Sequence, residues 1–147
     1  MRFFRRTPVR TFVIYPAIAV AWELAVNGNQ LSPAYYFAPL MIWGYLQYRL
    51  CGRYRVIRGG GGPGLETPPE RLVATGLYAY TRNPMYLGFL LVLLGWAVFL
   101  SSILAFLFLP AFIVYMNHFQ IEPEERALAT LFGQAFAAYK ARARRWL

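Results

Sequence analysis

Residues 85–117, MYLGFLLVLLGWAVFLSSILAFLFLPAFIVYMN, decide the fold class of this chain because they contain no charged side chain. Two apolar runs, 85–100 and 103–117, are separated only by a serine pair. In lipid, backbone amides and carbonyls must find their partners within the segment, so each run is predicted to be an α-helix. The short polar break predicts that the two helices form a hairpin.

Two further apolar segments precede this hairpin, at 12–26 and 34–51. A run of about 15 residues covers about 22 Å of a hydrocarbon core about 30 Å thick, so flanking aromatic residues must extend each span. Residues 1–22 also resemble a secretory signal, but we expect them to be retained as the first span. The prediction is an all-α polytopic membrane protein with about four transmembrane helices.

The composition agrees with a membrane protein. Of 147 residues, 59% are apolar and 14% are charged, whereas soluble domains carry about 25% charged residues. The net charge of +9 favours anionic lipid head groups over nucleic acid as partners in so apolar a chain. One cysteine and one histidine predict neither an internal disulfide nor a metal site.

The length predicts a single domain over 1–147. We divide it into two N-terminal spans (1–58), a Gly/Pro-rich loop (59–69) and a second helical hairpin with a C-terminal helix (70–147). The run GGGGPG at 59–64 is interpreted as a flexible joint, because no Gly-Lys-Ser/Thr follows it as in a phosphate-binding loop.

The arrangement of Lys and Arg predicts the orientation in the membrane. Four precede the first segment, six lie between the second and third when Arg49 is counted, and five follow the fourth. None occurs in 27–33 or at 101–102, so all 15 fall on one side. The positive-inside rule then places both termini and the middle loop in the cytoplasm, at the inner membrane.

A polar motif, RNPMYLG at 82–88, marks the start of the third segment. Asn83 is a favoured N-cap and Pro84 a favoured first residue, so a helix is predicted to begin here. Its N-terminus beside Arg82 is a receptor for a carboxylate; the alternative is an ordinary capped membrane helix. Gly88 allows close helix packing.

Three of the six acidic residues cluster after the fourth segment, in IEPEERAL at 121–128. They either offset the dipole of a new helix or, as Glu124 and Glu125, bind a cation. Apolar residues at 128, 131, 132, 136, 139 and 146 predict an amphipathic helix on the membrane surface. If the hairpin brings both polar sites together, a small zwitterionic ligand with hydroxyls fits between them.

These motifs resemble those of integral-membrane methyltransferases related to isoprenylcysteine carboxyl methyltransferase and phosphatidylethanolamine N-methyltransferase. The resemblance covers 76–146 and rests on GLY at 76–78, RNPMYLG at 82–88, EERAL at 124–128, FG at 132–133 and Tyr139. Two positions depart from the pattern: Asn83 stands where the carboxyl methyltransferases usually have His, and Gln120 stands where an Arg often occurs.

The resemblance implies use of S-adenosylmethionine, with S-adenosylhomocysteine as product, at the cytoplasmic face. The residues that it implies for cofactor binding are Tyr78, Arg82, Asn83, Pro84, Tyr86, Gly88, Glu124 and Glu125. Asn83 and Glu125 are the catalytic candidates, Glu125 as the acceptor of an ammonium proton. His118 is a second candidate base, and Glu23, an intramembrane carboxylate, is a functional candidate in its own right.

We therefore predict an enzyme that transfers a methyl group from S-adenosylmethionine to a lipophilic acceptor entering from the bilayer. The acceptor is left open between a prenylcysteine-like carboxylate and an amino-phospholipid. The alternative from another class is a small non-enzymatic membrane protein, a transporter or assembly factor. A bundle this small can also pair with itself, so a homo-oligomer stays open.

Overall fold

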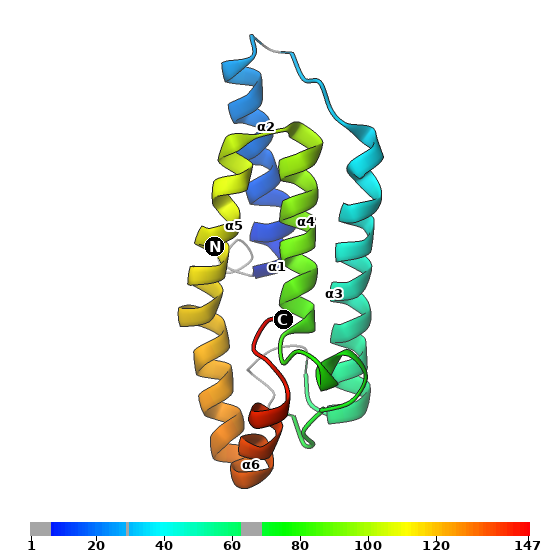
Figure 1. Cartoon of the computed structure of the whole chain (residues 1–147), viewed down its shortest axis with the longest axis vertical. Helices are drawn as coiled ribbons and strands as arrows, with labels where there is room; N and C mark the ends of the chain where they lie inside the picture. The colour runs from blue at the N-terminus through cyan, green and yellow to red at the C-terminus, as the bar shows by residue number, and fades with distance from the viewer. Residues whose placement is uncertain (1–6, 29, 63–68) are drawn as a thin grey trace. The chain divides into compact units, whose positions relative to one another are not determined.

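The computed structural model describes residues 7–28, 30–62 and 69–147, which form helices and contain no β-strand. The predicted all-α class is therefore confirmed (Figure 1). Part of the predicted loop 59–69, residues 63–68, lies outside the described residues. The helical elements are α1 (Thr7–Val9), η2 (Arg10–Ile14), α2 (Tyr15–Val26), η3 (Tyr35–Phe37), α3 (Ala38–Gly59), η4 (Gly76–Ala79), α4 (Pro84–Leu100), α5 (Ile103–Met116), η5 (Asn117–Ile121) and α6 (Glu122–Arg142).

Each predicted apolar segment is helical. By length and composition, two helical runs are able to cross a bilayer: Thr7–Val26 and Ile103–Arg142. Helix α4 is apolar throughout but shorter, at 17 residues. Large apolar side chains such as Trp22, Trp43 and Leu107 point outward, as in proteins whose surface faces lipid.

Two wide helical turns each end two residues before a proline. The π-type turn η2 ends at Ile14, before Pro16, and η5 ends at Ile121, before Pro123. Proline removes an amide donor and its ring clashes with the carbonyl four residues earlier, and a wider turn relieves both effects. The chain therefore stays helical through both prolines.

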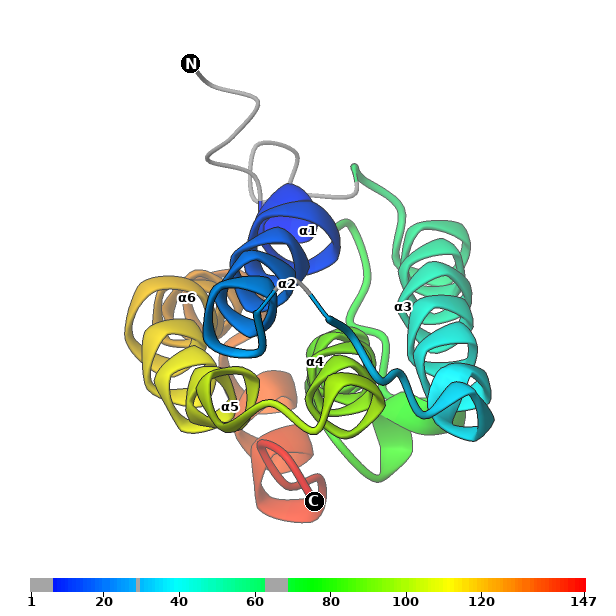
Figure 2. The same cartoon turned by 90° about the horizontal axis from the view of Figure 1, so that it is seen from above.

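The chain contacts divide into two compact units. Unit 1 comprises Met1–Leu46 and Gly88–Ile113, and unit 2 comprises Gln47–Leu87 and Val114–Leu147. The prediction of a single domain stays a prediction. In unit 1, α4 lies between α3 on one side and α2 and α5 on the other (Figure 2). A core cluster of Ala19, Ala97, Leu100 and Ala105 joins α2, α4 and α5.

The predicted serine turn between α4 and α5 is confirmed. Ser101 adopts a positive φ of 52°, and the Ser102 amide donates to the carbonyl of Ala97 at 3.0 Å. The hydroxyl of Ser102 accepts from the amide of Ala105 at 3.3 Å, which caps the start of α5. The two serines thus reverse the chain while satisfying its backbone groups.

Close approach of α3 to α4 in unit 1 depends on Gly44. A Cβ atom at this position would lie 2.7 Å from the carbonyl oxygen of Gly88, a backbone atom that cannot move aside. Any residue at position 88 would supply this carbonyl, so the packing role of Gly88 stays a prediction. Gly52, farther along α3, would place a Cβ atom 3.4 Å from the flexible Met85 Sδ.

Gly44→Ala is therefore expected to destabilise the protein by about 1–3 kcal/mol, because overpacking outweighs the gain in helix propensity. Gly52→Ala is the matched control on the same helix and is expected to stabilise by up to about 1 kcal/mol. Thermal unfolding in detergent measures both. Equal effects of the two substitutions would contradict the role of Gly44 as a packing contact.

Candidate active site

Unit 2 contains the predicted polar motifs, beginning with the turn that starts α4. The helix begins at Pro84, as predicted, and the carbonyl of Asn83 accepts from the amides of Tyr86 and Leu87, both at 3.1 Å. The Leu87 bond is the ordinary first bond of the helix, whereas the Tyr86 bond occupies one of the amides that the first turn was expected to offer to a ligand. The carbonyl of Pro84 accepts from Gln47 Nε2 at 2.9 Å.

Glu125, on the first turn of α6, is held between two guanidinium groups. Arg82 donates to Glu125 Oε1 from Nε at 3.1 Å and from Nη2 at 2.9 Å. Arg145 Nη2 donates to Glu125 Oε2 at 2.8 Å. The Glu125 side chain is only 11% exposed and that of Arg82 only 9%. This is a largely buried ion-pair network, in which each oxygen of the carboxylate is charge-paired.

The ion-pair network sets the protonation state of Glu125. This residue lies outside the apolar part of the helical run Ile103–Arg142. Burial alone would raise the pKa of Glu125, but hydrogen bonds and charges from Arg145 and Arg82 outweigh burial and hold the pKa below its ordinary value. Glu125 is thus ionised at neutral pH and bonded to cations. A carboxylate in this state is a poor acceptor for a substrate proton.

The C-terminal residues complete the network. The carbonyl of Arg145 accepts from Asn83 Nδ2 at 2.8 Å and from the hydroxyl of Thr81 at 3.3 Å. The amide of Arg82 donates to the carbonyl of Arg144 at 2.8 Å, and Trp146 Nε1 donates to Asn117 Oδ1 at 3.0 Å. The chain end therefore runs back beside the start of α4 (Figure 1).

Glu124, the neighbouring acid, has different partners. Its Oε1 accepts from the hydroxyl of Tyr86 at 2.7 Å and from Gln120 Nε2 at 3.3 Å. Successive helical residues point about 100° apart, so two adjacent carboxylates reach different surroundings. Among the described residues, no ion pair involves Glu124.

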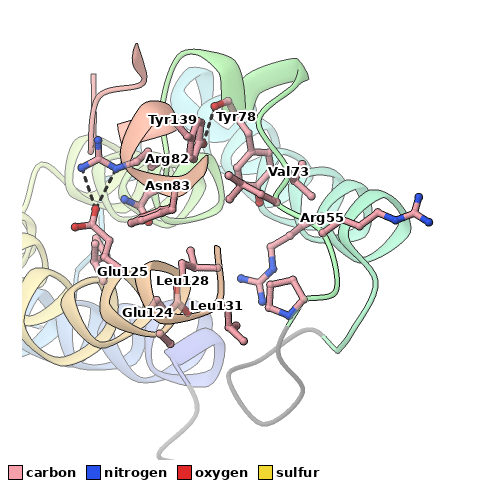
Figure 3. Close-up of a pocket in the computed structure, with 16 residues that line it drawn as sticks. Arg55, Val73, Tyr78, Arg82, Asn83, Glu124, Glu125, Leu128, Leu131 and Tyr139 are labelled. Carbon is pink, nitrogen blue, oxygen red and sulfur yellow. Dashed lines mark hydrogen bonds and ion pairs between the residues drawn. The ribbon is translucent and has the colours of Figure 1, made fainter. Parts of the chain in front are cut away.

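A pocket lies beside both carboxylates, with a cavity volume of about 100 Å³. Its apolar lining includes Val73, Leu128 and Leu131 (Figure 3). Its polar residues are Arg55, Arg71, Tyr78, Arg82, Asn83, Glu124, Glu125 and Tyr139. Sites that enclose a drug-sized ligand typically measure about 300–1,000 Å³. The pocket is therefore large enough to enclose only part of a ligand of that size.

One wall of the pocket is fixed by a chain of tyrosines. Tyr139 donates to the carbonyl of Tyr78 at 2.7 Å, and Tyr78 donates to the carbonyl of Cys51 at 3.3 Å. Burial raises the pKa of Tyr78 well above its ordinary value, so its hydroxyl stays a neutral donor. These bonds connect α6, η4 and α3 within unit 2.

A break in α6 brings Tyr139 to this wall. Gly133 has φ 48° and ψ −119°, a left-handed conformation that favours glycine. Beyond it, Phe136, Tyr139 and Ala143 form a core cluster with Leu72, Ala74, Leu128 and Phe132. The Phe132-Gly133 pair of the sequence motif is therefore the point at which α6 changes direction.

A family model of phospholipid methyltransferases matches residues 64–135, which include Tyr78, Arg82, Asn83 and both acids of the pocket. An uncharacterized protein of Haemophilus influenzae (strain ATCC 51907 / DSM 11121 / KW20 / Rd) is 46% identical over 63 residues, which make up 43% of this chain and 100% of that relative. The chain belongs to the phospholipid methyltransferase family. Membership implies methyltransferase activity. No solved structure matches the chain significantly.

In this phospholipid methyltransferase family member, the structure brings together most of the predicted site residues. Tyr78, Arg82, Asn83, Glu124 and Glu125 line the pocket, and Tyr86 reaches it through Glu124. Pro84 is buried at the start of α4, and Gly88 belongs to unit 1. Their roles in cofactor binding stay predictions.

The two other candidates lie elsewhere. His118 is not among the lining residues of the pocket; its side chain is 63% exposed and its Nδ1 is 3.7 Å from Glu122 Oε2. Glu23 belongs to unit 1, where its Oε2 accepts from Asn27 Nδ2 at 2.9 Å. Neither residue contributes to the pocket in unit 2.

Two sequence predictions about the C-terminal region are wrong. The acidic residues do not begin a separate helix, because η5 joins α5 to α6 in one helical run, Ile103–Arg142. Trp146 does not extend an amphipathic helix, because α6 ends at Arg142 and the tail turns back. The wide turn η5 keeps the backbone helical up to Pro123, which explains the first difference. Ala143 is extended and the amide of Arg144 donates to the carbonyl of Tyr80 at 3.2 Å, which explains the second.

The sequence does not indicate the place of three further arginines. Arg145 pairs with Glu125, although the sequence presents it only as a charge near the membrane surface. Arg55 and Arg71 line the pocket, although the sequence presents them only as basic residues that set the orientation. The sequence shows an excess of basic residues near an acid pair. This excess does not indicate which basic residue pairs with which acid.

Glu125→Gln is expected to lower the free energy of unfolding by about 1–3 kcal/mol at neutral pH, because the buried guanidinium of Arg82 and the partly exposed one of Arg145 lose their charged partner. Since the folded pKa of Glu125 is depressed, this stabilisation is complete above the ordinary pKa of about 4.3 and is lost as the pH falls below it. The difference in the free energy of unfolding between Glu125→Gln and the natural protein should therefore become smaller at acidic pH.

Thermal unfolding across pH in detergent measures this effect. Glu122→Gln, one turn away, removes only an exposed pair with His118 and is expected to change stability by less than about 0.5 kcal/mol. A pH-independent gap for Glu125→Gln would contradict the assigned charge pairing.

Proposed function

We propose that this chain is an integral-membrane methyltransferase that uses S-adenosylmethionine to methylate a lipophilic acceptor at the cytoplasmic face. The observation that carries the proposal is that two motifs about 40 residues apart in sequence line one pocket in unit 2. The family match supports the methyltransferase chemistry. The pocket residues supply groups that are complementary in charge and hydrogen bonding to S-adenosylmethionine.

The donor set of the pocket fits the cofactor. Glu124 supplies a carboxylate that accepts only neutral donors within the described residues, so it is suited to an ammonium group or to ribose hydroxyls. Arg55 supplies a cation for a carboxylate. Tyr78, Leu128 and Leu131 supply aromatic and apolar surface for a base or a sulfonium. S-adenosylmethionine would supply an electrophilic methyl group on its sulfonium.

In this proposal Arg82 and Glu125 position the site. They fix the turn before α4 and the first turn of α6 through their mutual ion pair, so the Asn83 and Glu124 side chains keep their places. Asn83 is already bonded to the Arg145 carbonyl, which orients its amide. This assignment differs from the sequence-based prediction that Glu125, or a water held by it, accepts the proton of an ammonium substrate.

The protein's contribution to the reaction is alignment and exclusion of water. Methyl transfer from a sulfonium is an in-line displacement, so holding nucleophile and methyl group in contact is the main requirement. A carboxylate acceptor needs no base, whereas an ammonium acceptor must lose its proton. Glu124, the acid without a cationic partner among the described residues, is the candidate to receive that proton, directly or through water.

We also propose four membrane spans, formed by Thr7–Val26, the first part of α3, α4 and α5, with both termini in the cytoplasm at the inner membrane. The helical runs and the one-sided distribution of all 15 basic residues support it. The acceptor would enter sideways from the bilayer.

S-adenosylhomocysteine is expected to bind the purified protein with micromolar or tighter affinity. Glu124→Gln should weaken binding by about 1.5–3 kcal/mol, because a charged hydrogen-bond acceptor is lost, with little change in melting temperature. Titration calorimetry measures the affinity. Unchanged affinity in a folded Glu124→Gln protein would contradict the role of Glu124, and no binding at millimolar ligand would favour the non-enzymatic alternative.

Reporter fusions at each terminus test the spans. Both fusions should report a cytoplasmic location, because all the basic loops then face the cytoplasm. A C-terminal reporter active in the periplasm would contradict an even number of spans.

A further inference from the structure

A second cavity in unit 2 lies along the C-terminal half of α3. This α3 groove has a volume of about 440 Å³, and its lining includes Arg49, Arg53, Arg55, Val56, Ile57 and Met85. Arg49 and Arg53 lie one helical turn apart, so their guanidinium groups emerge on the same side of α3. Three cations therefore gather in one groove.

The acidic side chains that the structure describes do not neutralise these cations. Within residues 7–28, 30–62 and 69–147, no salt bridge joins Arg49, Arg53 or Arg55 to a carboxylate. In unit 2, Glu122 pairs with His118, Glu124 bonds to Tyr86 and Gln120, and Glu125 pairs with Arg82, Lys140 and Arg145. The carboxylate of Glu70, the other described acid of unit 2, lies beside Gly60, just after α3. The charge of the groove is thus complementary to an anion.

Apolar surface adjoins the cations. Val56, Ile57 and Met85 contribute to the groove itself, and Ile57 is 74% exposed. Leu50, next to Arg49, is 61% exposed. A free phosphate would leave this surface in water, and a nucleic acid would bring little apolar surface to cover it. A ligand with both a phosphate and an acyl chain satisfies both parts of the groove.

The position of the groove points to the same ligand. The N-terminal part of α3 is the second apolar segment, 34–51, and the arginines begin where that segment ends. Basic clusters at the cytoplasmic end of a membrane helix attract anionic head groups. The groove thus adjoins the predicted level of the lipid phosphates.

We propose that the α3 groove binds an anionic phospholipid, with its phosphodiester on Arg49 and Arg53 and the start of an acyl chain on Val56, Ile57 and Met85. The site is separate from the methyl-transfer pocket, although Arg55 lines both. A lipid bound here would remain beside that pocket without being the methyl acceptor. The inference depends on the groove and does not require the proposed methyl transfer.

The test uses the full chain in a non-ionic detergent and three probes: dioctanoyl phosphatidylglycerol, dioctanoyl phosphatidylcholine and glycerol 3-phosphate. Phosphatidylglycerol is expected to bind at least about tenfold more tightly than the other two, with an affinity that falls as salt is added. R49Q/R53Q should weaken that binding about tenfold or more. R126Q/R142Q removes the same charge from exposed positions on α6 and should leave it within about twofold.

Several results would overturn the proposal. Equal weakening in both double variants would mean that overall charge, and no defined groove, attracts the lipid. Equal affinity for phosphatidylcholine would remove the anionic preference, and equal affinity for glycerol 3-phosphate would indicate a site for free phosphate. Should R49Q/R53Q fail to fold, R49Q alone must still weaken binding several-fold.

S-adenosylhomocysteine titration in the same samples separates this proposal from the proposed function. R49Q/R53Q is expected to bind that ligand normally, because neither residue lines the methyl-transfer pocket. Loss of lipid binding with normal S-adenosylhomocysteine binding supports the groove. Normal lipid binding in R49Q/R53Q overturns it, whatever the result with S-adenosylhomocysteine.

Discussion

A carboxylate held between two guanidinium groups is the interaction on which unit 2 depends. Glu125 connects the turn before α4, the first turn of α6 and the C-terminal tail, which are separate in sequence, with contacts of 2.8–3.1 Å to Arg82 and Arg145. A buried carboxylate without such partners would be costly, and so would a buried guanidinium. The three segments must therefore assemble together, and the pocket lies against their junction.

This constraint gives two adjacent acids different partners. Glu125 forms ion pairs with Arg82 and Arg145, whereas Glu124 accepts hydrogen bonds only from the neutral donors Tyr86 and Gln120 among the described residues. One helical step between them is enough to give one acid cationic partners and the other only neutral ones, although both line the pocket. Two adjacent acids that look equivalent in the sequence motif therefore have different surroundings, because they point in different directions from α6.

The apolar pattern predicted the helices well because lipid leaves few alternatives for the backbone. The start of α4 at Pro84 and the turn at Ser101 and Ser102 followed from local chemistry that needs no tertiary information. The pairing of Arg82 with Glu125 was harder, since both had been interpreted as ligand-binding residues. Long-range ion pairs depend on the whole fold, and a charge count does not indicate which partner each charge takes.

The C-terminal region shows why pattern reading fails beyond a certain point. Apolar residues at helical spacing predicted a straight amphipathic helix, but Gly133 takes a left-handed conformation and redirects the chain toward Tyr78. Arg55 and Arg145 lie outside residues 64–135, which the family model matches, and neither belongs to the motifs that carry the resemblance. Both are found only when the structure places them beside the acids.

The central claim is that the pocket beside Glu124 serves methyl transfer to a lipid. The most direct test incubates the purified protein with a membrane lipid extract and S-adenosylmethionine labelled in its methyl group, and then extracts the lipids. The account predicts label in the lipid fraction with the natural protein and a large loss with folded Glu124→Gln. Labelling that is absent with a folded natural protein, or that is undiminished in the variant, would contradict it.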